Sequence, residues 1–184
     1  MKTSKLWICL MACTTMAVAR PVMLLSKKQP FSITASAPAG WIGPTYKGWP
    51  SYEVWSFSNG EPASASFIEI RLDPARETKL DLNTATADQV KKTFNDFTNP
   101  EVEKIANTIV GQTPVVIWAV HNVDGELLIA ELRRKSSNFH FTLRTQNRKS
   151  LRHYDKTFLD LVKSVQILTT EPGLSPKSAT RPEH

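Results

Sequence analysis

The chain has 184 residues, with 23 Lys and Arg against 17 Asp and Glu and a formal charge of +6. Hydrophobic residues make up 41% of it and charged residues 22%, which is ordinary globular composition and excludes wholesale disorder. Seven glycines exclude a glycine-built fibre, and the length predicts one domain with short appendages.

The N-terminus has the layout of an export signal. Two lysines precede an apolar run over residues 6–14, and an A-x-A cleavage site follows at 17–19. We therefore expect residues 1–19 to be a signal peptide and the mature protein to be periplasmic or secreted. Cleavage removes Cys9 and Cys13, which excludes a disulfide framework or a cysteine nucleophile from the mature chain.

A second interpretation of the N-terminus remains open. Residues 10–13 (LMAC) resemble a bacterial lipobox, in which Cys13 would be acylated and become the first mature residue. The protein would then be a membrane-anchored lipoprotein. An uncleaved anchor is the third alternative, although the apolar run is shorter than the ~20 residues of a membrane span.

The remaining chain divides into a linker, one domain and a tail. Residues 20–30 are expected to be a linker, although 22–25 could pair as an edge strand. The single domain is expected over 31–168. Residues 169–184 are rich in proline and cannot bury enough surface to offset their ordering entropy, so we expect a disordered tail.

The first half of the domain contains strand patterns. Alternation predicts a strand from Phe31, followed by a turn at 38–41. Two further strands are predicted over 52–57 and 64–72 and are joined as a hairpin around Asn59-Gly60. In the second of them, Phe67, Glu69 and Arg71 point one way and Ile68, Ile70 and Leu72 point the other.

Two helices are predicted next. Thr86 and Gln89 form a capping box for a helix with Val90, Phe94 and Phe97 on one face. Asn99 is a good N-cap and Pro100 suits the first helical position. Apolar residues then recur at helical spacing up to Gly111, a natural helix stop: Val102, Ile105, Ala106 and Ile109.

Three strands and a last helix complete the domain. The strands are expected over 115–121, 126–134 and 138–145, with hairpin turns at Asp124-Gly125 and, less clearly, at Ser136-Ser137. The last helix carries apolar residues at spacings of four, three and four: Tyr154, Phe158, Leu161 and Val165.

The simplest register of these strands gives the sheet two unlike faces. One face is wholly apolar and must be covered: Ala119 aligns with Ala130 and Leu143, and Ile117 with Leu132 and Phe141. The opposite face is mixed, with Val120 beside Ile129 and Arg144, Trp118 beside Glu131 and Thr142, and Val116 beside Arg133 and His140.

The mixed face has two interpretations. In the first it is a partly solvated sheet, with Trp118 under a helix or loop and Glu131 in cross-strand charge pairs. In the second it is a recognition surface on which a tryptophan beside arginines anchors a protein partner. The partner-binding residues would then be Trp118, Arg133, His140 and Arg144.

No motif for catalysis, a cofactor or a metal is found. His121 and His140 fall on opposite faces of the predicted sheet and cannot share a metal. Residues 81–83 begin like a calcium loop but lack its later glycine and carboxylate. The carboxylates on the predicted strands are explained as solvated face residues: Glu53, Glu69, Asp73 and Glu131. We therefore expect no catalytic residues, no cofactor and no metal.

The whole pattern resembles the PsbP-like and DcrB-like domains over residues 31–168. The resemblance rests on the aromatic strand start at 31–33 (FSI), the Pro38-x-Gly40-Trp41 turn, the element order and the closing helix ending FLDLVKSV. It implies an α+β fold, an antiparallel sheet flanked by helices as an α/β/α sandwich. It also implies a non-catalytic domain that binds or helps assemble other proteins, commonly in the bacterial envelope.

Two other functions remain open. One is a small periplasmic enzyme, a hydrolase with a spatial triad. The other is a protein that binds anionic lipid or another ligand. A protein partner is expected first and anionic lipid second, while export argues against nucleic acid.

Overall fold

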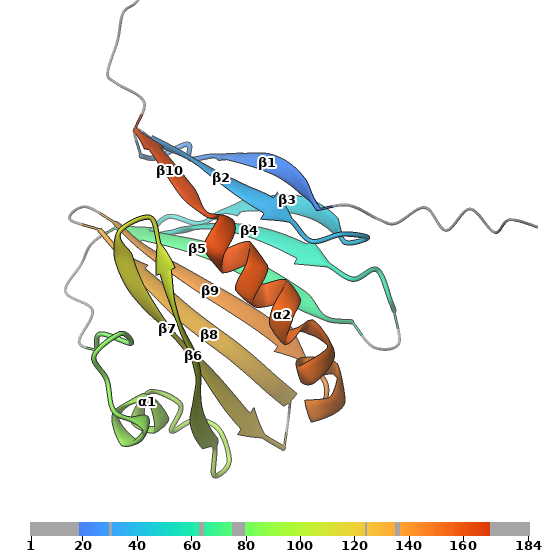
Figure 1. Ribbon diagram of the computed structural model, residues 1–184, viewed down its shortest axis with the longest axis vertical. Helices are drawn as coiled ribbons and strands as arrows, with labels where there is room; N and C mark the ends of the chain where they lie inside the picture. The colour runs from blue at the N-terminus through green and yellow to red at the C-terminus, as the bar shows by residue number, and fades with distance from the viewer. Residues whose placement is uncertain are drawn as a thin grey trace, which may run out of the picture.

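The computed structural model describes residues 19–169 apart from 30, 63–64, 75–79, 124 and 135–136 (Figure 1). Cys13, the expected signal peptide up to residue 18 and the expected tail from residue 170 lie outside the described residues. The elements in chain order are β1 Arg20–Leu25, β2 Phe31–Ala37, β3 Ile42–Gly48, β4 Glu53–Ser58, β5 Phe67–Pro74, α1 Ala87–Thr93, β6 Glu101–Val110, β7 Thr113–Asn122, β8 Gly125–Arg133, β9 Ser137–Thr145, α2 Arg148–Ser164 and β10 Gln166–Thr169.

The strands form two antiparallel sheets. The large sheet has the order β3-β4-β5-β9-β8-β7-β6, and the small sheet has the order β1-β2-β10. Because β5 pairs with β9, the first hairpins of the chain join the later three-strand block in one sheet. The α+β class expected from the sequence is confirmed, with two sheets and two helices among the described residues.

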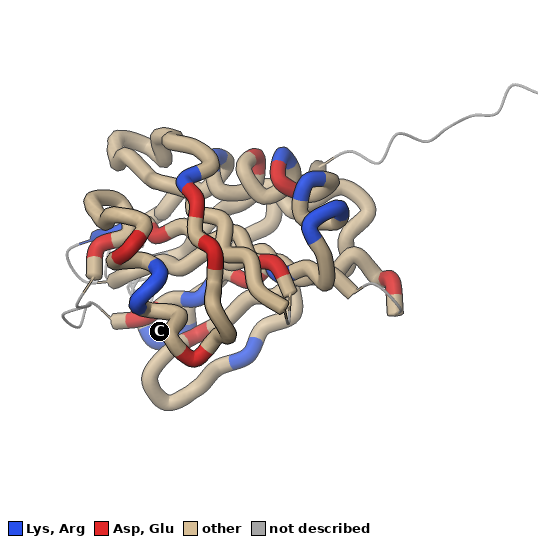
Figure 2. Tube along the Cα trace, turned by 90° about the horizontal axis from the view of Figure 1, so that it is seen from below, with Lys and Arg blue, Asp and Glu red and all other residues tan. Residues whose placement is uncertain are grey.

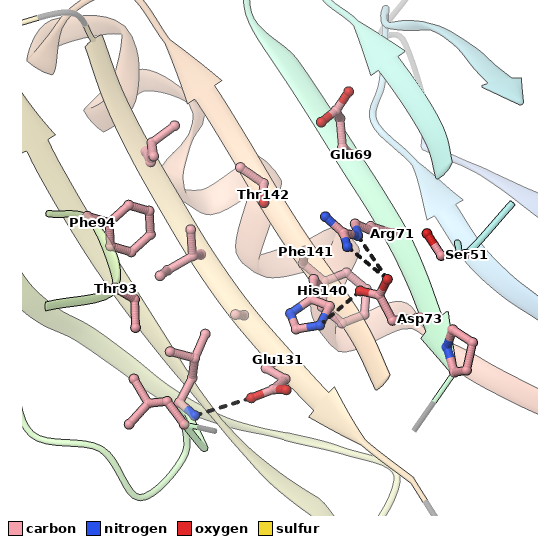
Figure 3. A pocket seen from close by; sticks show the side chains of 16 residues that line it. Ser51, Glu69, Arg71, Asp73, Thr93, Phe94, Glu131, His140, Phe141 and Thr142 are labelled. Atoms are coloured by element: carbon pink, nitrogen blue, oxygen red, sulfur yellow. Dashed lines mark hydrogen bonds and ion pairs between the residues drawn. The ribbon is translucent and has the colours of Figure 1, made fainter. Parts of the chain in front are cut away.

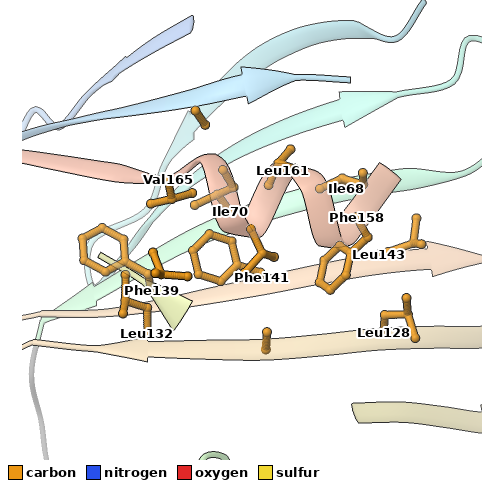
Figure 4. Packing of buried hydrophobic residues seen from close by; sticks show 14 of the residues in the cluster. Ile68, Ile70, Leu128, Leu132, Phe139, Phe141, Leu143, Phe158, Leu161 and Val165 are labelled. Atoms are coloured by element: carbon orange, nitrogen blue, oxygen red, sulfur yellow. The ribbon is translucent and has the colours of Figure 1, made fainter. Parts of the chain in front are cut away.

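The main core lies on one face of the large sheet (Figure 4). Helix α2 buries Phe158, Leu161 and Val162 against apolar side chains of β5, β8 and β9. The small sheet packs on the same face through Leu24 and Ile33. Figure 1 shows α2 lying across the large sheet with the small sheet beside it, so these two form one layer.

The opposite face of the large sheet has a second, smaller core. Here a segment over 80–97 covers β7 and β8, and Val90 of α1 is fully buried. The predicted capping box is present: Gln89 N–H donates to the Thr86 hydroxyl, and the Gln89 side chain accepts from Thr86 N–H. The helix ends at Thr93, and Phe94 and Phe97 stack on each other just beyond it.

Two expectations for the N-terminal half need correction. Residues 20–25, expected within a linker, form β1, which pairs with β2 along its length and buries Leu24. The edge-strand alternative over 22–25 is the one that the structure contains. Strand β3 over 42–48 was not predicted, because its sequence IGPTYKG consists largely of residues typical of turns.

The helix predicted from Asn99 to Gly111 is wrong. Residues 101–110 form strand β6, which pairs with β7 through a hairpin whose turn contains Gly111 at φ +61. The register shifts between Lys104 and Ala106, so β6 has a bulge at Ile105. A bulge inserts one residue into the alternation and makes the apolar spacing resemble that of a helix.

The three-strand block is present, but β8 is displaced by two residues from its expected register. Ala119 pairs with Leu128 rather than Ala130, and Leu128 pairs with Leu143. In the first hairpin Asn122 pairs with Gly125, which lies two residues before the partner that the expected register gives it. Since a shift of two keeps each side chain on its face, the apolar and mixed faces are as predicted.

Candidate functional site

The mixed face of the large sheet is partly covered by residues 80–83. Three side chains of the sheet hold this segment through its backbone. Trp118 Nε1 donates to the carbonyl oxygen of Leu82 at 2.8 Å, and the Arg133 guanidinium donates to the carbonyl oxygen of Leu80. Leu82 N–H donates to Glu131 Oε2 at 3.2 Å. These polar contacts therefore fix the start of the segment against the sheet.

Asn83 adds a link between two strands. Its Oδ1 accepts from Val116 N–H at 2.9 Å, and its Nδ2 donates to the carbonyl oxygen of Glu131 at 3.1 Å. The pairing of β7 with β8 begins one step further on, at Ile117 and Ala130. The asparagine side chain thus satisfies backbone groups at the end of that ladder. Asp81 accepts from Asn83 N–H and shapes the turn.

Beside this segment the mixed face forms an open groove of about 850 Å³ (Figure 3). Its floor consists of side chains from β5, β9 and β8, and its far wall is the 80–94 segment with the ring of Phe94. One half is apolar, with Leu82, Leu127 and Ile129. The other half is polar and carries Glu69, Arg71, Asp73, Glu131, His140 and Thr142.

Arg71, Asp73 and His140 form one linked cluster in the polar half, as Figure 3 shows. Arg71 donates to Asp73 Oδ1 from Nε at 3.1 Å and from a terminal nitrogen at 2.9 Å. His140 Nε2 lies 3.2 Å from Asp73 Oδ2. The Arg71 guanidinium also lies 4.1 Å from the centre of the Tyr52 ring, which fixes the arginine from its other side.

Burial lowers the pKa of His140 below its ordinary value, and the positive charges of Arg71 and Arg133 act in the same direction. The carboxylates of Glu131 and Asp73 oppose this shift but do not reverse it. The imidazole is therefore neutral at neutral pH, and it can donate one N–H to Asp73. With a neutral histidine, the charged residues that line the groove within the described part of the chain are three carboxylates and one arginine, Arg71.

Glu131 is the least solvated of these carboxylates, with a side chain only 1% exposed. Its Oε2 lies 3.1 Å from Arg133 Nε, an ion pair without the alignment of a hydrogen bond, and accepts from Leu82 N–H. Its Oε1 is buried and has no hydrogen-bond partner within the described residues. A buried carboxylate with a free oxygen adds negative potential at the end of the groove.

The four residues predicted to bind a partner are not brought together in one exposed patch. Trp118 is 4% exposed and Arg133 is half-buried, and both hold the 80–82 segment. Only His140 lines the groove. Arg144 is exposed on β9 and pairs in register with Phe67. Trp118 lies under a loop, as in the first interpretation of the mixed face. Partner binding by these four residues stays a prediction.

The description of four strand carboxylates as solvated face residues is wrong for two of them. Glu53 and Glu131 are each 1% exposed. Glu53 accepts from Lys27 N–H at 2.8 Å, from the Tyr46 hydroxyl at 2.9 Å and from the Ser26 hydroxyl at 2.5 Å, so it ties β4 to the loop after β1. The position of the 80–97 segment, which buries Glu131, gave no signal in the alternating pattern of the strand.

A second pocket of about 590 Å³ lies between β6 and the start of α2. There His121 contacts carboxylates through both ring nitrogens: Nδ1 contacts buried Glu126, and Nε2 lies 3.0 Å from Glu103. His140 is on the other face of the sheet, as predicted. On the side of the molecule seen in Figure 2, acidic and basic residues are interspersed.

Two kinds of feature are absent from the described residues. No group of three or more His, Cys, Asp or Glu within this part of the chain could hold a metal ion. No helix of the described chain is both long and apolar enough to cross a membrane.

No protein-family model matches the sequence, and no curated protein matches it. Several solved structures are similar to it, including the following two. The Saccharomyces cerevisiae Ran-binding protein Mog1p has a TM-score of 0.50 at 12% identity, covering 84% of this chain and 97% of its own. Cyanobacterial PsbP (CyanoP) from Synechocystis sp. PCC 6803 has 0.49 at 16%, covering 86% and 98%. Both are PsbP-like folds, and the likeness to Mog1p confirms, at the level of architecture, that this chain has a PsbP-like fold.

Proposed function

We propose that this protein is a non-catalytic domain that binds another protein through the groove on the mixed face, and that it does so in the cell envelope after export. The observation that carries the proposal is the composition of the groove. Among its described lining residues, one half is apolar and the other holds three carboxylates against one arginine, beside a neutral histidine. Such a site fits a protein segment that presents apolar side chains next to a basic one.

The proposal has two further supports. Mog1p is described as a Ran-binding protein, so this fold serves protein binding in one known case. Export rests on the sequence of residues 1–19, with its lysines, apolar run and A-x-A site. The alternative localisation through an acylated Cys13 would also place the domain in the envelope.

The geometry at His121 disfavours the alternative of a hydrolase with a spatial triad. A triad histidine uses one ring nitrogen for its carboxylate and the other for the nucleophile. Here Glu126 and Glu103 occupy both nitrogens, and none of the described residues that line that pocket carries a hydroxyl or thiol. His153 is exposed on α2, and its ring packs against Tyr154.

The test compares two variants of the native protein. Thr142 lies on the groove floor between Glu69 and Ile129, so Thr142→Arg places a long side chain in the groove. Thr45→Arg makes the same change at an exposed position of β3. A photo-crosslinking residue at Thr93 captures the partner in cells, and affinity for the purified partner is then measured for both variants and the unchanged protein.

The proposal predicts one dominant crosslinked protein and at least a tenfold loss of affinity for Thr142→Arg, with Thr45→Arg unchanged. Equal affinity of the two variants would place the partner elsewhere and overturn the groove as its site. Hydrolysis of an ester or peptide probe that is lost in His121→Gln would instead support the enzyme.

A further inference from the structure

The outer face of the small sheet carries exposed apolar side chains. Met23 is 58% exposed, Leu25 is 60% exposed and Leu168 is 42% exposed. Leu25 and Leu168 both pair in register with Ser32, so the three residues form one row across the sheet. Ser32, in the middle of that row, is only 5% exposed. The two leucines therefore form an apolar strip across the outer face of the sheet rather than two isolated side chains.

This face is uncharged and its surroundings are basic. The strands β1, β2 and β10 contain no Asp or Glu, and their one charged residue is Arg20. Lys27 and Lys28 lie in the loop after β1, separated from Leu25 by Ser26, and the Lys27 ammonium lies 4.7 Å from the centre of the Tyr46 ring. Glu53, the carboxylate that contacts this loop, is buried and already accepts from Ser26 and Lys27 N–H.

An aromatic pair lies at the same end of the sheet. Lys28 Nζ donates to the carbonyl oxygen of Trp49, which brings the loop after β1 against the loop after β3. Trp49 is 48% exposed and stacks on Tyr52 with ring centres 5.9 Å apart. Amphipathic rings beside lysines and exposed leucines are the side chains that favour a membrane–water interface.

We propose that this face docks on a bilayer surface that contains anionic lipid. Leu25, Leu168 and Met23 enter the headgroup boundary, while Lys27 and Lys28 bind lipid phosphates. The inference is independent of the proposed partner groove. The small sheet packs on the large sheet through its inner face and the groove is on the opposite face of the large sheet, so the two sites are separate except at Tyr52, whose ring lies 4.1 Å from the Arg71 guanidinium of the groove.

Charge favours a membrane over a second copy of the chain as the occupant. Two copies meeting through this face would bring Lys27 and Lys28 of each copy together with no facing carboxylate among the described residues, and that costs free energy. An anionic bilayer supplies the missing negative charge.

The experiment measures flotation of the full chain with vesicles of phosphatidylcholine alone and with vesicles that also contain phosphatidylglycerol. Two double variants test the face: Leu25→Gln with Leu168→Gln, and Lys27→Gln with Lys28→Gln. Their matched controls lie elsewhere on the surface. Ile109→Gln with Val123→Gln changes two exposed apolar residues, and Lys91→Gln with Lys92→Gln changes another adjacent lysine pair.

The lysine variant is expected to bind the anionic vesicles roughly 30-fold more weakly than the unchanged chain. The leucine variant is expected to lose about tenfold, and both controls should bind as the unchanged chain does. Equal binding by all variants would assign membrane affinity to residues 1–19 and overturn the proposal. Equal binding to neutral and anionic vesicles would also overturn it, as would a dimer in light scattering that only the leucine variant loses.

Discussion

Trp118 donates its indole N–H to the carbonyl oxygen of Leu82 at 2.8 Å, across a separation of 36 residues in the sequence. The ring is 4% exposed and belongs to the smaller core with Val90. A long-range hydrogen bond from a buried ring thus fixes the segment that forms one wall of the groove. The tryptophan thus contributes to the groove through this wall.

Two replacements of Trp118 should therefore separate the contribution of its hydrogen bond to stability from that of its packing. Trp118→Phe keeps most of the ring but removes the bond to Leu82, and we expect a loss of about 1 kcal/mol in the free energy of unfolding. Trp118→Ala also leaves a cavity, and we expect a loss of about 3–5 kcal/mol. Denaturant unfolding measures both, with Trp49→Phe at an exposed position as the control. A Trp118→Phe variant as stable as the unchanged chain would contradict the role of the bond.

Strand β6 shows why a correct apolar spacing gave the wrong element. Before the bulge at Ile105, Glu103 faces the main core side with Ala119, and after it Ala106 does so with Ile117. The interval of three in place of two, together with Asn99 and Pro100, matches a helix start. Residues 101–110 form a strand because they pair with the edge of β7, and that edge exists only in the assembled sheet.

The groove could be predicted in part. The alternation of β7, β8 and β9 predicted a face with Trp118 and Glu131 on it, and it survived a two-residue error in register because the side-chain period is two. The pairing of β5 with β9, which adds Arg71 and Asp73 to the site, depends on contacts over about 70 residues of sequence. No local pattern encodes such a pairing.

Glu131 and Arg133 should be energetically coupled, because the buried carboxylate has the arginine as its ion-pair partner. Glu131→Ala removes the acceptor for Leu82 N–H and leaves Arg133 with Asp81, at 3.6 Å, as its ion-pair partner among the described residues. We expect losses of about 3–5 kcal/mol for Glu131→Ala and less for half-exposed Arg133→Ala. The double variant should lose about 1–3 kcal/mol less than the two single losses together.

The control for this comparison of single and double variants combines Glu131→Ala with Arg148→Ala. Arg148 forms an ion pair with exposed Glu101 on the other side of the sheet, so its effect should add to that of Glu131→Ala within about 0.5 kcal/mol. Additive losses for Glu131 and Arg133 would mean that their contact at 3.1 Å contributes nothing to folding.

His140 should make stability depend on pH below neutrality. Burial lowers the pKa of His140 in the folded protein below its ordinary value of 6.5, so the unfolded chain binds the proton more tightly. The free energy of unfolding is then at its full value above about pH 6.5 and falls as the pH drops toward the folded-state pKa. His140→Gln removes this group and should flatten the curve between about pH 5 and pH 7.

Thermal unfolding at a series of pH values checks the prediction, with exposed His153→Gln as the control that keeps the slope. Asp73 contacts His140, so Asp73→Asn is measured together with His140→Gln. That variant removes one of the two carboxylates that raise the pKa of His140. Its stability should therefore fall more steeply as the pH drops. A steeper slope in Asp73→Asn together with a flat one in His140→Gln would assign the dependence to the imidazole, whereas an unchanged slope in His140→Gln would assign it to other groups.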